Sequence, residues 1–330
     1  MTASISSARA LRIAAGAAVL APSVHNTQPW RFVLRPDALD ICVDRRRRLA
    51  IADPTGRQMY ISLGCALFNA RVSAAAAEQP VVVTRVPDGT YAEVVARLQT
   101  AADGAHVESE LASLAPLVEL RQSNRRQFAD DEVPQELIER LEAAAVAEGA
   151  LVQVLRTDEE RQTLATLSQA ADIMQITDPR YRAELRAWTT NDSHRLDGVR
   201  AAVVPHVDGS AQEDMPVRDF DTHGAGWLPA QTKANKHQCL VIFGTEGDGP
   251  LAWLQAGEAL ERVWLEITRA GYVASLFTQV IEVPALRARL REELNLIMQP
   301  HVVVRIGRAP TTAPSLRRHL VDVLEDASGS

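Results

Sequence analysis

The feature that most constrains the fold of this 330-residue chain is a repeated pattern of helix and strand. The helical pattern QMYISLGCALFNARVSAAAA contains G-x-A-L at Gly64–Leu67, and LAWLQAGEALERVWLEITRAG contains it again at Gly257–Leu260. A predicted strand follows each helix, at 81–87 and 301–307, and another helix and strand precede each one. This order predicts an α+β chain built from two tandem copies, 1–115 and 116–330.

The glycine of each G-x-A-L predicts how the two helices are placed. Glycine inside a helix costs about 1 kcal/mol relative to alanine, so a mid-helix glycine usually permits a close backbone approach. Gly64 and Gly257 occupy the same place in their helical patterns. We therefore expect these two helices to pack directly against each other.

Composition excludes several classes of protein. Hydrophobic residues make up 46% of the chain and charged residues 23%, which is typical of a globular protein. No apolar run approaches the roughly 20 residues of a membrane span, and the net charge of −7 argues against nucleic-acid binding. The three cysteines fit neither a disulfide framework nor a metal site. We expect a cytoplasmic protein without a metal.

The two copies differ in their polar stretches. The first half carries PSVHNTQPW at 22–30 between its first helix and first strand, where the second half has only the turn Glu148-Gly149. The second half opens with LRQSNRRQF at 120–128, for which the first half has no counterpart. Each copy thus retains a different polar segment.

The arginines of the second segment indicate a phosphorylated ligand. Arg121, Arg125 and Arg126 supply guanidinium groups, which suit phosphate, and Ser123 adds a hydroxyl. RIGRAPTTAPSLRRHL near the C-terminus carries a second basic cluster. Any one of these arginines alone is better explained as a surface charge. As a set, they indicate a phosphorylated ligand. No G-x-G-x-x-G or P-loop is present, so a Rossmann nucleotide site is disfavoured.

These segments resemble those of a known family. PSVHNTQPWRF is similar to the P-S-x-x-N-x-Q-P-W segment of FMN-dependent nitroreductases, and RQSNRRQF resembles their R-x-S-x-R opening. Together with ADPTGRQMYISLGCALFNAR, LQAGEALERVWL and RIGRAP, they resemble the Acg-type nitroreductases of mycobacteria over nearly the whole chain. The resemblance implies a nitroreductase-like fold whose two fused copies imitate the family's homodimer, as a monomer or a further homodimer.

The resemblance also implies a single FMN site, because each polar segment survives once. The second half would contribute its opening segment, its ASLFTQ stretch (274–279) near flavin N5, where the family's usual Glu-Gly pair is missing, and a C-terminal basic pair at the phosphate. The loop of the first half would approach from the other side, with Gln28 shaping the turn. The residues so implied are Pro22, Ser23, Asn26, Gln28, Arg121, Ser123, Asn124, Arg125, Leu276, Phe277, Arg317 and Arg318. We interpret His25 as a structural histidine, since flavin N5 itself carries the hydride.

A long insertion at about 176–236 leaves two functions open. One is an oxidoreductase in which NAD(P)H reduces FMN, which then reduces a nitroaromatic compound or a quinone. The other is an FMN store whose flavin is occluded by the insertion as a lid, because a face closed to nicotinamide cannot turn over. The insertion could also pad the surface or form an oligomer contact. The spacing of His194, His206 and His223 matches no metal-ligand pattern.

Overall fold

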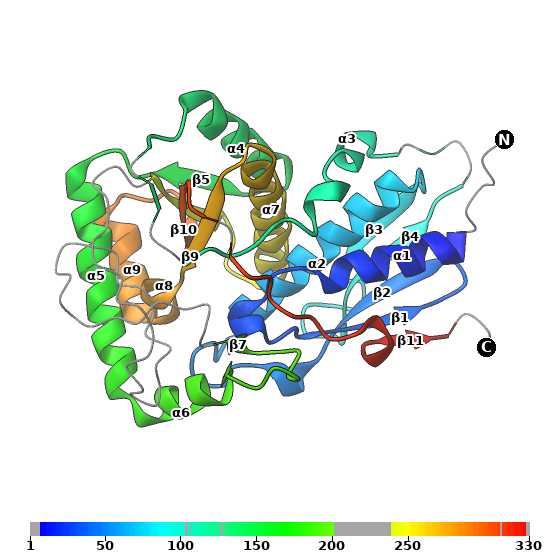
Figure 1. Ribbon diagram of the computed structural model, residues 1–330, viewed down its shortest axis with the longest axis horizontal. Helices are drawn as coiled ribbons and strands as arrows, with labels where there is room; N and C mark the ends of the chain where they lie inside the picture. The colour runs from blue at the N-terminus through cyan, green and yellow to red at the C-terminus, as the bar shows by residue number, and fades with distance from the viewer. Residues whose placement is uncertain are drawn as a thin grey trace.

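The computed structural model describes residues 7–102, 105, 107–125, 128–129, 131–200, 239–310 and 312–327. In this part of the chain, two mixed helix-and-sheet lobes meet along a pair of long helices (Figure 1). The arrangement confirms the predicted α+β class. Residues 201–236 of the predicted insertion, with His206 and His223, and also Arg126, lie outside the described residues.

The first sheet has the strand order β11-β1-β2-β4-β3. Its neighbouring strands are antiparallel, except that β1 pairs in parallel with β11. Figure 1 shows the C-terminal tail crossing from the second lobe to reach this sheet, so the far end of the chain completes the sheet of the first half. The strands are β1 (Trp30–Leu34), β2 (Ala38–Val43), β3 (Val81–Arg85), β4 (Val94–Thr100) and β11 (Leu324–Asp326).

The second sheet is antiparallel throughout and has the order β5-β8-β10-β9. β9 therefore lies at an edge, which matters for the site described below. Its strands are β5 (Leu151–Val154), β8 (Cys239–Thr245), β9 (Val273–Phe277) and β10 (Gln299–Gly307). A separate parallel pair consists of β6 (Thr189–Thr190) and β7 (Val199–Arg200).

The four helices of the repeated pattern form close to their predicted bounds. They are α1 (Ser7–Val19), α2 (Arg57–Ala76), α4 (Gln135–Ala147) and α7 (Pro250–Arg269). The helix α5 begins at a capping box, in which Thr157 and Glu160 exchange side-chain-to-backbone hydrogen bonds. The other helices are α3 (Ser109–Ala112), α5 (Asp158–Thr177), α6 (Pro179–Ala187), α8 (Gln279–Glu282) and α9 (Pro284–Glu293).

Helices α2 and α7 cross at their glycines, which confirms the predicted packing. A Cβ atom on Gly64 would lie 2.0 Å from the carbonyl oxygen of Leu254 and 2.8 Å from the Cα of Gly257. A Cβ on Gly257 would lie 2.0 Å from the carbonyl oxygen of Ile61. One continuous hydrophobic cluster includes Trp30 of the first sheet and Trp264 of α7, so both lobes share a core.

A buried ion-pair cluster flanks this helix crossing. Arg71 of α2 contacts Glu258 of α7 at 2.8 Å and Glu148 at 2.5 Å, and Arg85 contacts Glu258 at 2.6 Å. Burial raises the pKa of Glu258, while Arg85 and Arg71 oppose the rise. The cluster ties α2 and β3 to the second lobe, and breaking such a buried pair is strongly destabilising.

We expect Gly64→Ala to reduce the free energy of unfolding by about 2–3 kcal/mol, because the added methyl group overlaps the backbone of α7 and forces the helices apart. Urea unfolding followed by circular dichroism measures this change. Gly16→Ala is the matched control: only Leu320 lies near, at 4.0 Å, so a gain of up to about 1 kcal/mol is expected. Equal effects of the two substitutions would contradict the close crossing.

Candidate functional site

Two pockets adjoin where the lobes meet. The inner pocket, about 840 Å³ including its mouth, is lined by α2, the loop before β1 and the end of β9. The outer pocket, about 1050 Å³, is lined by the same loop, the connection at 118–125, the segment 195–200 and the tail 314–317. The pockets form one site, because both are lined by Pro22, Ser23, Ser123 and Arg125.

The loop before β1 is held in a strained backbone conformation. His25, Asn26 and Gln28 have φ values of 47°, 54° and 50°, a region that residues with side chains rarely adopt. Ser23 Oγ accepts a hydrogen bond from the Gln28 backbone N–H at 2.9 Å, and Ser62 Oγ of α2 accepts one from Val24 N–H at 3.1 Å. Such strain persists only where surrounding contacts enforce it, and it clusters at functional sites.

Asn26 joins this loop to two distant segments. Its side-chain amide donates to the carbonyl oxygens of Gly198 at 3.1 Å and Leu316 at 3.2 Å. Its Oδ1 accepts a hydrogen bond from Arg317 Nη1 at 3.1 Å, and its backbone carbonyl accepts one from Gly198 N–H at 3.2 Å. The polar atoms of Asn26 therefore fasten the insertion and the C-terminal tail to the loop.

Gln28 makes a second link of the same kind. Its Nε2 donates to the carbonyl oxygen of Leu196 at 2.8 Å, and its Oε1 accepts from the backbone N–H of Arg318 at 2.8 Å. We predicted that Gln28 bonds to the backbone and so shapes its own turn. Its side chain does bond to backbone groups, but these belong to the insertion and the tail.

The described part of the insertion is docked onto the first lobe. Asp197 pairs with both Arg47 and Arg195, and these two guanidiniums lie 5.4 and 5.6 Å from the ring centroid of Trp188. Burial alone would raise the pKa of Asp197, but the hydrogen bonds from both arginines lower it below its usual value. The carboxylate of Glu184 accepts hydrogen bonds from the backbone N–H groups of Ile51 and Ala52. Segment 179–200 is thus bonded to the first lobe at several points.

The edge of β9 that does not pair with β10 faces the inner pocket. Asn124 N–H donates to the carbonyl oxygen of Ala274 at 2.9 Å, so the opening segment of the second half runs along this edge. Alternate residues of a strand direct their backbone groups to the same side. The N–H and C=O of Leu276 therefore point toward the same edge as those of Ala274, and Leu276 and Phe277 both line the inner pocket.

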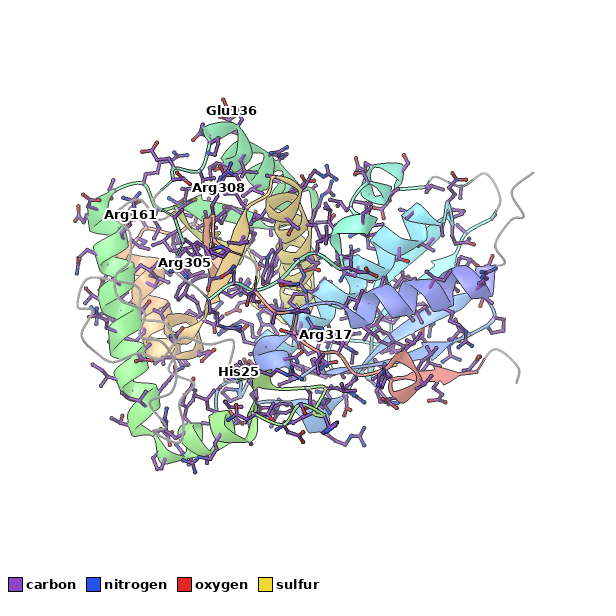
Figure 2. The ribbon with its side chains drawn as sticks, in the orientation of Figure 1. His25, Glu136, Arg161, Arg305, Arg308 and Arg317 are labelled. Carbon is purple, nitrogen blue, oxygen red and sulfur yellow. The ribbon has the colours of Figure 1, made fainter. Side chains whose placement is uncertain are left out.

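Two arginines of the outer pocket converge on the end of α1. Arg121 Nη2 donates to the carbonyl oxygen of Leu20 at 3.1 Å, and Arg317 Nε donates to that of Ala21 at 3.1 Å. Figure 2 shows Arg317 and His25 between the two lobes. Carbonyl groups at a helix C-terminus carry partial negative charge, which favours cations there. Arg121 also forms an ion pair with the buried Glu261 of α7 at 3.0 Å.

The twelve predicted residues divide into four groups by position: four line both pockets, Leu276 and Phe277 line only the inner pocket, three line only the outer pocket, and three line neither. The outer pocket is lined by Asn26, Arg121 and Arg317, in addition to the four residues that both pockets share. Gln28, Asn124 and Arg318 line neither pocket; Asn124 Nδ2 instead donates to the carbonyl oxygen of Pro310 at 2.8 Å. His25 lines the inner pocket.

Sequence reasoning missed several residues of the site. Gln58 and Ser62 line the inner pocket from α2, and Arg195, Asp197 and Arg200 line the outer pocket from the insertion. Glu261 was missed as well. The signal that could have identified Glu261 is a carboxylate placed between Leu260 and Trp264, two residues of the predicted apolar face of that helix.

A third pocket lies against α7. Its place on α7 corresponds, in the repeated pattern, to the place of the inner pocket on α2. When Gly64 is aligned with Gly257, Gln58 and Ser62 correspond to Leu251 and Gln255, and both of these line the third pocket. The turn at Gly149, before β5, takes the place of the loop before β1. Among the described residues, the first lobe contributes only Thr90, and no arginine lines this pocket.

Comparison with known proteins identifies full-length relatives in Mycobacterium tuberculosis. A protein of strain H37Rv named "Putative NAD(P)H nitroreductase" is 31% identical over 317 residues, covering 93% of this chain and 89% of the relative. The "Putative NAD(P)H nitroreductase acg" of the same strain is 28% identical over 295 residues, covering 88% and 86%. No protein-family model matches the chain.

Solved structures give a weaker likeness. The FMN and NADPH-dependent nitroreductase NfnB from Sphigopyxis sp. strain HMH is 18% identical, with a TM-score of 0.41, over 64% of this chain and 97% of that chain. A nitroreductase with bound FMN from Desulfitobacterium hafniense DCB-2 is 12% identical, with a TM-score of 0.38, over 62% and 94%. The sequence relatives are therefore the stronger comparison.

Within the described residues, none of the helices is long and apolar enough to cross a membrane. The same part of the chain contains no group of three or more His, Cys, Asp or Glu side chains that could hold a metal ion.

We expect Asn26→Ala to loosen the insertion and the tail together, because it removes three side-chain hydrogen bonds worth about 1 kcal/mol each. Hydrogen exchange at the Gly198 amide should accelerate while that of β10 amides is unchanged. Asn26→Gly is the control, since it loses the same bonds but relieves the left-handed backbone. Unchanged exchange at Gly198 in both variants would contradict the joining role.

Proposed function

The chain belongs to the Acg-type nitroreductase family, and from this premise we propose that it is an FMN-binding flavoprotein with one flavin site between its two halves. The observation that carries the proposal is the pair of adjoining pockets. Their shared lining combines Pro22 and Ser23 of the first half with Ser123 and Arg125 of the second. A ligand that spans both pockets would contact both halves.

The lining of each pocket supports a particular placement of the ligand. The outer pocket, with Arg121, Arg125 and Arg317, suits the phosphate, because guanidinium groups bind phosphate through charge-assisted hydrogen bonds. The inner pocket has apolar walls, including Ile61 and Phe277, beside the polar edge of β9, and this combination suits a flat heterocycle. We therefore assign the phosphate to the outer pocket and the flavin ring to the inner pocket.

The proposed activity is NAD(P)H-dependent reduction of a small acceptor such as a nitroaromatic compound or a quinone. Bound FMN would supply the hydride chemistry. The residues of this chain would bind and orient it, with the Leu276 backbone N–H available at the edge of β9 for the N5 side of the ring. His25 needs no acid or base role in this scheme.

The composition of the third pocket supports a single flavin site per chain. It lies at the corresponding place on α7, but its described lining has no arginine and takes only Thr90 from the other lobe. We propose that 1–115 and 116–330 are tandem copies whose second site has lost its ligand-binding residues. An internal pseudo-dimer of this kind would leave the protein a monomer or a second-level homodimer.

The alternative function is an FMN store without reductase activity. The docked segment 179–200 favours it, because 195–200 closes one side of the outer pocket and is bonded to Asn26 and Gln28. A flavin held behind this segment would be shielded from a nicotinamide donor. The three cysteines are free, in keeping with a cytoplasmic protein of either function.

We expect Arg125→Ala to raise the dissociation constant of FMN at least about tenfold, because a hydrogen bond to a charged group contributes about 1.5–3 kcal/mol. Riboflavin, which lacks the phosphate, should be affected less. Arg289→Ala serves as the control, because Arg289 is exposed, lines neither pocket and pairs with Glu293 of its own helix. Equal FMN affinity of both variants would contradict the assigned phosphate position.

The reductase function and the FMN-store function predict opposite results when the flavin-loaded protein is mixed anaerobically with NADPH or NADH. A reductase loses its flavin absorbance within seconds, and a store keeps it until dithionite is added. Bleaching by either nicotinamide would exclude the store. Bleaching by dithionite alone would exclude the reductase.

A further inference from the structure

A buried carboxylate that the proposed flavin site does not use pairs with Arg121 of the outer pocket. Glu261 is fully buried on α7, and its Oε1 lies 3.0 Å from Nε of Arg121, which is itself almost fully buried. The Arg121 guanidinium also lies 4.7 Å from the ring centroid of Trp264, one turn further along the same helix. Glu261 and Trp264 together fix where this guanidinium lies.

Arg121 and Arg317 form a like-charged pair. Both donate to carbonyl groups at the end of α1, and both line the outer pocket. The pKa of Arg317 is lowered to about 9, chiefly by burial and also by the nearby charge of Arg121, while Glu261 opposes the change. Two buried guanidiniums that lie close together repel each other unless a negative charge is nearby. Glu261 supplies such a charge from inside the protein.

We propose that Glu261 is the built-in counter-charge of the phosphate subsite and so sets how strongly the site prefers a phosphorylated flavin over its dephosphorylated form. This inference rests on the proposed FMN site. Glu261 does not line the pocket and is paired with Arg121, which does, so it is a positioning residue rather than a ligand-binding one. It stabilises the arginine pair while the phosphate is absent, and it offsets part of the pair's attraction for the phosphate when the phosphate is present.

Removing the charge of Glu261 should have two linked effects. Glu261→Gln keeps the size and the acceptor oxygen of the side chain but leaves the arginine pair uncompensated. The ligand-free protein should therefore melt at a lower temperature. In this variant the two guanidiniums repel each other more strongly than in the unaltered protein, so a bound phosphate relieves a larger repulsion. The affinity for FMN relative to riboflavin should therefore rise on the order of tenfold.

Glu258→Gln is the matched control. Glu258 lies one turn earlier on α7, is equally buried, and pairs with Arg71 and Arg85, neither of which lines the inner or outer pocket. Its substitution should also destabilise the protein. It should leave the FMN-to-riboflavin affinity ratio unchanged, which separates the charge of the pocket from stability in general.

The experiment is equilibrium dialysis of the flavin-free protein against FMN and, separately, riboflavin. A raised ratio in Glu261→Gln but not in Glu258→Gln supports the proposal, and an equal or lowered ratio overturns it. If Glu261→Gln does not fold, Glu261→Asp retracts the carboxylate by one methylene and should raise the ratio about threefold; an unchanged ratio there overturns the proposal too. Failure of the unaltered protein to bind FMN would instead overturn the proposed function.

Discussion

The close crossing of α2 and α7 is the contact on which the rest of the structure depends. Because neither Gly64 nor Gly257 has a side chain, the backbones of the two helices touch, and the two lobes share one hydrophobic core. This proximity places α2, the loop before β1 and the edge of β9 around the inner pocket. Any larger residue at the crossing would separate the surfaces that form the site.

The polar residues of the loop before β1 join segments that are far apart in the chain. Asn26 and Gln28 bond to 196–198 on one side and 316–318 on the other, and Arg47 adds an ion pair with Asp197. The outer pocket is therefore built from this loop and three other segments, two of which are hydrogen-bonded to the loop. The docked insertion and the C-terminal tail are consequently held by the same few hydrogen bonds.

The sequence alone predicts the parts of this structure that depend on local periodicity. The helical patterns around Gly64 and Gly257 fix α2 and α7, and the glycines themselves predict the crossing. The partners of Asn26 and Gln28 could not be predicted, because they lie about 170 and 290 residues away and no local pattern encodes such contacts. The same holds for β11, a strand of three residues, and for the pairing of Arg121 with Glu261.

The number of flavins bound per chain tests the central claim most directly. The purified protein, saturated with FMN and freed of excess, is denatured, and the released flavin absorbance is compared with the protein concentration. One FMN per chain is the predicted result, since the inner pocket is lined by Arg125 and adjoins the arginines of the outer pocket, whereas the described lining of the third pocket contains no arginine. Two per chain would contradict the loss of the second site, and none would contradict the flavin site itself.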